Sequence, residues 1–257
     1  MTVDPIPRDW KIGDHTLWAS FTRAIRLPSR STDDILVYPV GSPIEVVVGN
    51  PDVVSEEVLA YEAGYRVEPI DRVQIDLAGY YNDYDNVLSL EMTPGGPLGL
   101  PVVWGNLIAG DGYGVELSAG YKPWDWIEVG ISYTWARLDL HQKVGGTSDD
   151  IGDVGIGTSR VDEALPEHML SVRLSLDLPY DIEFDTYVYY MDEIRLFPID
   201  SYVRLDFRVG WAPTEWLELA GAVQNVTDDS HQEWQYEFQF TETLVPRGYW
   251  VGATLRF

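Results

Sequence analysis

The twelve residues from Pro246 to Phe257, PRGYWVGATLRF, decide the fold class of this chain. Side chains along a β-strand point alternately to its two faces. One face of this stretch is apolar and consists of Tyr249, Val251, Ala253, Leu255 and Phe257. The chain stops on that last aromatic residue, directly after the alternating pattern. A final strand of this kind predicts an antiparallel transmembrane β-barrel, in which the strand faces lipid and pairs with a neighbour.

The same alternation recurs about ten times, so the whole chain is expected to be all-β. The expected strands cover residues 17–21, 59–67, 73–81, 113–121, 127–135, 170–178, 182–190, 203–211, 217–223 and 249–257. Most of the apolar rows are about 9 to 11 residues long, which is the length of a tilted membrane strand. The opposite faces carry charged or small residues, such as Arg66, Asp76 and Glu116. A soluble sandwich alternates as well, so the length of the rows and the connections favour the membrane.

The connections between these strands alternate between short and long. The short ones, at 67–71, 122–126, 178–181 and 212–216, each hold a proline with an acidic residue close behind it, which is typical of tight turns. The long ones cover roughly 27–55, 92–103, 143–166 and 227–245, and a brief one lies near 197–200. This alternation is typical of an outer-membrane barrel. With Phe257 at the periplasmic end, the short turns fall in the periplasm and the four long loops fall outside the cell.

Aromatic residues are abundant, with 10 Trp and 16 Tyr, and they bracket the expected strands. Such residues suit the boundary between membrane and water, where a membrane barrel carries two aromatic girdles. Near the short turns lie Tyr121, Trp124, Trp126, Tyr180, Trp211 and Trp216. Toward the long loops lie Tyr81, Tyr84, Trp135, Tyr190, Tyr202, Trp234 and Tyr249.

Composition excludes several classes of function. The formal net charge of −25 argues against nucleic acid as a partner, because phosphate binding needs clustered Lys and Arg. The absence of cysteine excludes disulfides, thiolate catalysis and cysteine-based zinc sites. No run of about 18 apolar residues is present, so no membrane-spanning helix is expected. The segment Met1–Pro7 lacks the basic start and apolar stretch of a signal peptide, although the barrel pattern calls for export.

Several motifs, in this order along the chain, resemble those of one family, the TonB-dependent outer-membrane receptors. The matching segments are Trp18–Ser29 with its Arg-x-Pro end, Asn50–Pro51 followed by Glu56 or Glu57 and Tyr61–Tyr65, Tyr80–Asn86, Tyr113–Leu117 with its Gly-Val-Glu, Gln224–Asp228 with its Asn-x-x-Asp, and the terminal strand. The resemblance covers nearly the whole chain. Each motif alone is weak, whereas five in family order are fairly specific.

The resemblance implies a fold and a function. The family has a 22-stranded barrel filled by an N-terminal plug, so residues 1–257 are expected to form a single domain that supplies about ten strands and no plug. The parent receptor would lie in the cell outer membrane and take up a scarce nutrient, such as siderophore-bound iron, cobalamin or a glycan. Its partners would be outer-membrane lipid, the plug, TonB and a small nutrient ligand. The chain is expected to be a fragment that transports nothing alone, with Tyr249, Val251, Ala253, Leu255 and Phe257 as the signal read by the barrel-assembly machinery.

No catalytic or metal site is expected, and neither is a cofactor. The histidines His15, His141, His168 and His231 are far apart in the sequence, and no serine stands in a nucleophile motif. The loop 145–153 holds three aspartates that could bind calcium, but it does not match a 12-residue calcium loop. Ligand contacts are unknown, and the candidates are the loop aromatics Tyr38, Trp104, Trp234, Tyr236 and Phe238. Four lumen-facing residues, Arg173, Arg204, Asp206 and Arg208, are expected to form ion pairs with one another or to contact a plug inside the barrel.

Two alternatives to the receptor remain at the level of sequence. The first is a small closed barrel that acts as a passive channel, because ten strands is an even number. The second is a soluble antiparallel β-protein with a binding role. An outer-membrane lipase or protease is a further option that no motif supports.

Overall fold

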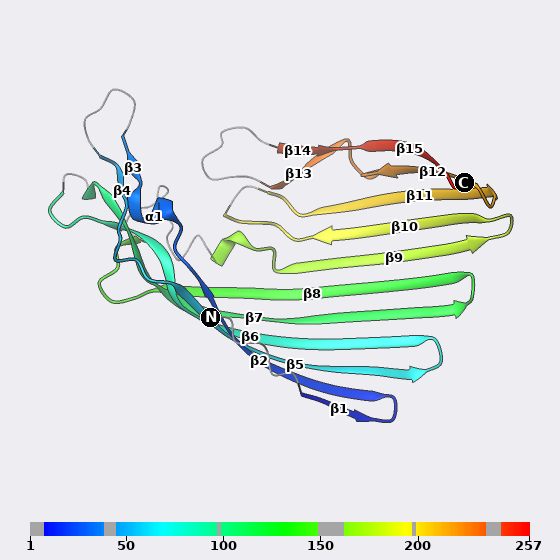
Figure 1. Cartoon of the computed structure of the whole chain (residues 1–257), viewed down its shortest axis with the longest axis horizontal. Helices are drawn as coiled ribbons and strands as arrows, with labels where there is room; N and C mark the ends of the chain where they lie inside the picture. Colours follow the sequence, from blue (N-terminus) through cyan, green and yellow to red (C-terminus); the bar gives the residue numbers. More distant parts are fainter. Residues whose placement is uncertain (1–7, 39–44, 97–98, 149–161, 197–198, 235–242) are drawn as a thin grey trace.

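The protein, seen in a computed structural model, is an open antiparallel sheet that forms one long wall (Figure 1). The structure describes residues 8–38, 45–96, 99–148, 162–196, 199–234 and 243–257. Eleven strands lie side by side in chain order. They are β1 (Arg8–Ile12), β2 (His15–Arg26), β5 (Glu56–Ile70), β6 (Val73–Met92), β7 (Val102–Trp124), β8 (Ile127–Gln142), β9 (His168–Leu178), β10 (Ile182–Met191), β11 (Tyr202–Thr214), β12 (Leu217–Gln224) and β15 (Gly248–Leu255). All ten expected strands are present, and β1 is an addition to them.

The register of the sheet brings the apolar rows onto one face. Leu77 lies opposite Leu117, which in turn lies opposite Tyr133, and the same matching continues to β15. Many of these side chains are exposed, from Leu117 at 37% to Val251 at 89% of full exposure, and those of β9 are half-buried among their neighbours. A wide apolar face that no other described element covers is what a lipid-facing wall requires. We call it the apolar face, and we call the opposite one the polar face.

Aromatic side chains lie at both ends of the apolar face, as expected for two girdles. Toward the long connections the rings of Phe21, Tyr61 and Tyr81 follow one another across three strands, with centroids 5.1 and 6.3 Å apart. At the short-turn end Trp124 stacks on Trp126 at 6.0 Å. Two of the residues that were expected in the girdles, Tyr84 and Tyr202, lie on the polar face instead.

The short turns join neighbouring strands at one end of the wall, on the right of Figure 1. Three of the expected turn prolines are in fact inside strands, immediately before a two-residue turn. Pro69, Pro123 and Pro213 each lie where the register shifts, next to a β-bulge. A bulge leaves a residue without a ladder partner, so the missing N–H of proline costs nothing there. Only Pro179 lies in a turn itself, where Tyr180 and Asp181 both have positive φ.

The hydrophobic core lies at the other end, where the long connections fold together. There β6 and β7 run far beyond the expected rows, and β4 (Val47–Val48) adds in parallel to β7 while pairing with β3 (Leu36–Val37). The short helix α1 (Arg30–Asp34) lies in the same region (Figure 1). Leu90, Val102, Ile108 and Leu140 are buried here. We call this region, built from the described residues within 27–55, 84–108 and 143–148 together with Leu140 of β8, the cap.

Three further elements complete the description. The single turn η3 (Asp162–Ala164) precedes β9, and β13 (Ser230–Trp234) pairs with β14 (Thr243–Pro246) as a separate ribbon beside β15. Among the residues that the structure describes, no helix is both long and apolar enough to cross a bilayer. The two outer strands of the wall, β1 and β15, each pair with one neighbour in these residues, so the sheet is open. Both run toward the short-turn end, because eleven is an odd number of antiparallel strands.

Candidate functional site

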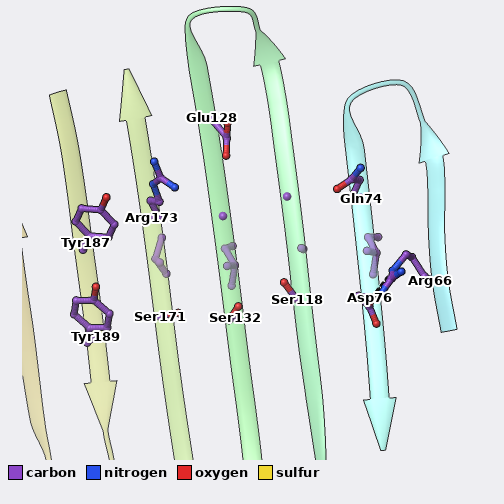
Figure 2. Close-up of a pocket in the computed structure, with 16 residues that line it drawn as sticks. Arg66, Gln74, Asp76, Ser118, Glu128, Ser132, Ser171, Arg173, Tyr187 and Tyr189 are labelled. Carbon is purple, nitrogen blue, oxygen red and sulfur yellow. Dashed lines mark hydrogen bonds and ion pairs between the residues drawn. The ribbon is translucent and has the colours of Figure 1, made fainter. Parts of the chain in front are cut away.

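The polar face carries a trough whose floor is made of small residues (Figure 2). One register row crosses five strands from β6 to β10 and consists of Asp76, Ser118, Ser132, Ser171 and Tyr189. The next row toward the short turns places Gly120 opposite Gly130. The trough has a volume of about 490 Å³. Because serine and glycine are short, the middle of the wall is open to any molecule that enters from the polar side.

Tall side chains rise on both sides of this floor, as Figure 2 shows. On one side Arg66 of β5 pairs with Asp76 of β6 at 2.6 Å. On the other side Arg173 of β9 lies over the ring of Tyr187, 5.6 Å from its centroid. The trough is therefore flanked by one arginine on each side, and both were expected on the polar face.

Beyond the trough, ion pairs run across the polar face from β9 to β15. Arg208 reaches Glu183 at 2.9 Å and Asp185 at 3.0 Å, and Asp185 also accepts a hydrogen bond of 2.6 Å from the hydroxyl of Ser175. Arg256 continues the series by pairing with Glu218 at 2.8 Å. Of the four residues expected to pair with one another, Arg204 and Asp206 do so, whereas Arg173 and Arg208 both pair with Asp185. These ion pairs connect neighbouring strands across the polar face.

A second polar cluster lies at the long-loop end of the wall, near the start of β11 and the end of β12. Asp206 is buried and accepts hydrogen bonds from Nε and Nη2 of Arg204, at 2.9 and 2.8 Å. The same carboxylate accepts the backbone N–H of Asn225 at 2.9 Å. Glu233 of β13 joins the cluster, at 3.5 Å from Arg204 and 2.9 Å from His231. The carboxylate of Glu233 thus connects Arg204 of the wall to the ribbon β13–β14.

Asn225 explains the Asn-x-x-Asp motif that the sequence singled out. It has a left-handed backbone with φ of 55°, which asparagine tolerates better than most residues, and it ends β12. Its side chain is fully buried and donates to the carbonyl of Val245 at 3.2 Å. Arg247 donates to the carbonyls of Asn225 and Val226 and pairs with Asp229 at 3.1 Å. Asn225 and Val226 of the motif therefore tie the end of β12 to Val245 and Arg247, just before β15.

The cap holds its connections with a few specific contacts. Lys143 pairs with Asp85 and donates to Asn86 Oδ1 at 2.9 Å. The hydrogen bond from Lys143 lowers the pKa of Asp85 below its ordinary value. Thr147 donates both its N–H and its hydroxyl to Oε2 of Glu91. Residues 143–148 are thereby fixed to the extension of β6.

The sequence-based ligand candidates in the loops do not form one site in the described residues. Trp104 is packed into the cap, where its indole N–H is buried without a partner, and Tyr38 donates to Glu45 at 2.8 Å. Tyr236, Phe238 and the side chain of Trp234 lie outside the described residues, as does most of the aspartate-rich loop 145–153.

Three of the four histidines each stack on a tyrosine. His15 stacks on Tyr65 and His168 stacks on Tyr133, each with the tyrosine hydroxyl near its Nδ1 atom. His231 stacks on Tyr202 with ring centroids 4.2 Å apart. No group of three metal-ligating side chains occurs in the part of the chain that the structure describes.

The fold has clear counterparts among solved structures. The ferric-catecholate import receptor Fiu of E. coli K12 aligns with a TM-score of 0.67 and 16% identity over 96% of this chain and 33% of its own. A mutant of the ferric enterobactin receptor PfeA from Pseudomonas aeruginosa gives 0.70 and 16%, over 96% and 38%. The ferric yersiniabactin uptake receptor FyuA from Yersinia pestis gives 0.68 and 15%, over 96% and 35%. The chain thus spans little more than a third of the length of these receptors.

The sequence itself identifies the family. A comparison with curated proteins found no match. Residues 5–226 match the family model described as TonB dependent receptor-like, beta-barrel. That match covers most of the chain and includes every wall strand except β15. The chain belongs to the TonB-dependent receptor β-barrel family.

Proposed function

We propose that this chain is part of the wall of an outer-membrane receptor that takes up a scarce nutrient with energy supplied through TonB. The observation that carries the proposal is the division of the sheet into two faces. The eleven strands share an apolar face with many exposed side chains, while their other face holds ion pairs and hydroxyls. The proposed substrate class is siderophore-bound iron, in line with the printed names of Fiu, PfeA and FyuA.

The partners follow from the two faces and the two edges. Outer-membrane lipid would cover the apolar face, and a plug would cover the polar face, where Ser118, Ser132 and Ser171 offer hydroxyls to a neighbouring backbone. Further strands would complete the barrel at β1 and β15, so residues 1–257 act as one domain of its wall. TonB would act on the plug, and the nutrient would enter from the side of the cap.

The C-terminal strand has the form expected of an assembly signal. Tyr249, Val251, Ala253 and Leu255 lie on the apolar face of β15, and Phe257 follows the strand with its side chain fully exposed. In the described residues β15 pairs with β12 alone, which leaves its second edge free. We propose that the barrel-assembly machinery binds these five residues before that edge is paired.

The absence of cysteine provides a direct test of location and orientation. Val144 of the cap and Tyr180 of a short turn are both highly exposed, so each can be replaced by cysteine without loss of packing. A maleimide that does not cross membranes should label Val144→Cys on intact cells, and should label Tyr180→Cys only after the outer membrane is opened. Labelling of both on intact cells, or of neither, would exclude the proposed topology.

Function is tested by uptake. Cells that make the protein should accumulate iron from ferric siderophores, and this accumulation should disappear when either the gene of this protein or TonB is deleted. Uptake that persists without TonB would favour a passive channel instead. A folded protein that remains in solution without detergent would exclude both membrane functions.

A further inference from the structure

Buried polar atoms without a partner gather at one place in the cap. Among the described residues, five side-chain nitrogen and oxygen atoms are buried and have no hydrogen-bond partner. Three of them are Oε1 of Glu91, Nε2 of Gln142 and the hydroxyl oxygen of Ser148. A folded protein rarely leaves buried polar atoms unpaired, so a group of them marks the place of a bound water or ion.

The contacts of one short segment bring these three side chains together. Thr147 donates both its N–H and its hydroxyl to Oε2 of Glu91. Ser148 follows it in the chain and is fully buried. Gly146 precedes it, and a Cβ atom at Gly146 would lie 2.5 Å from Nε2 of Gln142. The extension of β6, the end of β8 and this segment therefore meet at one small polar space.

Glu91 brings a negative charge to this space. Its Oε2 atom is hydrogen-bonded to Thr147, whereas its Oε1 atom is buried and has neither a donor nor a cation within the described residues. Lys143, a cation of the same segment, is engaged with Asp85 and Asn86. A buried carboxylate is costly unless its charge is compensated. The space therefore lacks positive charge.

We propose that this space binds a calcium ion through Oε1 of Glu91, the hydroxyl of Ser148 and the side-chain amide of Gln142. Calcium takes about six to eight oxygen ligands, and carboxylates, amide and backbone carbonyls and water all serve. The amide of Gln142 presents its oxygen after half a turn about its last bond, because its two ends have nearly the same shape. A water molecule would satisfy the hydrogen bonds but would leave the charge of Glu91 uncompensated.

The ion would tie residues 146–148 more firmly to β6 and so hold the cap in place. Ser148 belongs to the loop 145–153, whose aspartates the sequence singled out, although those aspartates lie outside the described residues. Because the described residues supply one carboxylate, binding should be weak, with a dissociation constant of about 10⁻⁴ to 10⁻³ M. Binding depends on the cap alone, so it stands whether or not the protein imports siderophores.

Hydrogen exchange at the amides of 146–148 tests the site in the protein purified in detergent. The exchange is measured at neutral pH with a chelator and with about 10 mM calcium, which is about ten times the weakest expected dissociation constant. Protection in the unchanged protein should rise about tenfold with calcium. Magnesium at the same concentration should raise it much less, because magnesium gives up its water reluctantly. An equal effect of both ions would indicate general screening of charge and would count against the site.

Three variants locate the ion. Glu91→Gln should abolish the calcium effect, and Ser148→Ala should reduce it at least about threefold while leaving protection in the chelator nearly unchanged. Glu45→Gln is the matched control, because it removes a cap carboxylate that accepts the hydroxyl of Tyr38, and it should respond as the unchanged protein does. If Glu91→Gln loses protection even in the chelator, Ser148→Ala decides.

Two results would overturn the proposal. The first is a full calcium effect in both Glu91→Gln and Ser148→Ala, which would place the ion elsewhere. The second is no calcium effect in the unchanged protein, which would leave a water molecule as the bridging group. Neither result depends on uptake, so each is separate from a failure of the proposed function.

Discussion

Replacing Asp206 with alanine should release the connection between β12 and β15 from the wall. The change removes two hydrogen bonds to the guanidinium of Arg204, at 2.9 and 2.8 Å, and one to the N–H of Asn225, at 2.9 Å. It leaves Arg204, whose side chain is only 22% exposed, with Glu233 at 3.5 Å and the ring of Tyr189 at 5.8 Å as its contacts. The buried N–H of Asn225 is left without any acceptor.

The structure sets the size of the effect. Breaking a buried ion pair from one side costs about 3–5 kcal/mol, because a charge stays buried without compensation. Glu233 retains part of that compensation, whereas the orphaned N–H adds about 1–3 kcal/mol. We therefore expect the free energy of unfolding to fall by about 3–5 kcal/mol in total. The matched control is Asp177→Ala, on the same face but exposed and without an ion pair in the described residues, which should change stability by less than about 0.5 kcal/mol.

Guanidinium unfolding of the protein in lipid vesicles, followed by tryptophan fluorescence, measures both variants. Hydrogen exchange at the amide of Asn225 supplies a local readout, and protection there should be lost in Asp206→Ala. A double-mutant cycle with Arg204→Met should give a coupling energy of about 1–3 kcal/mol. The reasoning is refuted if Asp206→Ala costs no more than the control, or if the coupling energy is close to zero.

Three other changes probe the rest of the fold. Gly114→Ala should lower stability by about 1–3 kcal/mol, because its Cβ would overlap a backbone oxygen and the ring of a tyrosine, while Gly79→Ala, with its nearest contact at 3.7 Å, should cost less in the same unfolding assay. Asp139→Lys should raise stability by up to about 1 kcal/mol, because Asp139, Asp111 of β7 and Asp83 of β6 lie opposite one another in one row and repel. An unchanged midpoint of unfolding would contradict this. The contact of Asp85 with Lys143 should stabilise the cap fully above the ordinary carboxylate pKa of about 4 and be lost as the pH falls through the lowered pKa of Asp85. The protection of the amides of 143–148 against hydrogen exchange, relative to their intrinsic rate at each pH, should fall only in that acid range, and Lys143→Met should show the low protection at every pH.

Most of the wall could be predicted because its strands alternate in hydrophobicity and lipid enforces that pattern on every residue. The five residues of β1 carry too short a row to be recognised. The extensions of β6 and β7 were missed because bulges near Tyr84 and Val87 shift the alternation by one residue. Beyond those bulges the strands pack inside the cap and are buried on both faces, so polar and apolar residues no longer alternate.

The candidate sites were predictable only in part. Alternation alone assigns Arg204, Asp206 and Glu116 to the polar face. It does not show that Asp206 also holds the N–H of Asn225, because that contact joins residues on different strands and depends on the exact register. The close contact of Trp18 with Gly64 was equally hidden, since nothing in a single strand indicates which residue of the next strand lies opposite. Pairing is a property of two strands, whereas the sequence pattern describes one.

The number of strands determines how the wall can be completed. Because β1 and β15 run in the same direction, joining them directly would create a parallel seam in an otherwise antiparallel sheet. Two copies of the chain with the same orientation in the membrane would meet at two seams of that kind. An odd number of additional strands makes both seams antiparallel, and eleven more would give the 22 strands of the family. The free edges are therefore better suited to a different section of barrel than to closure on themselves or to a second copy.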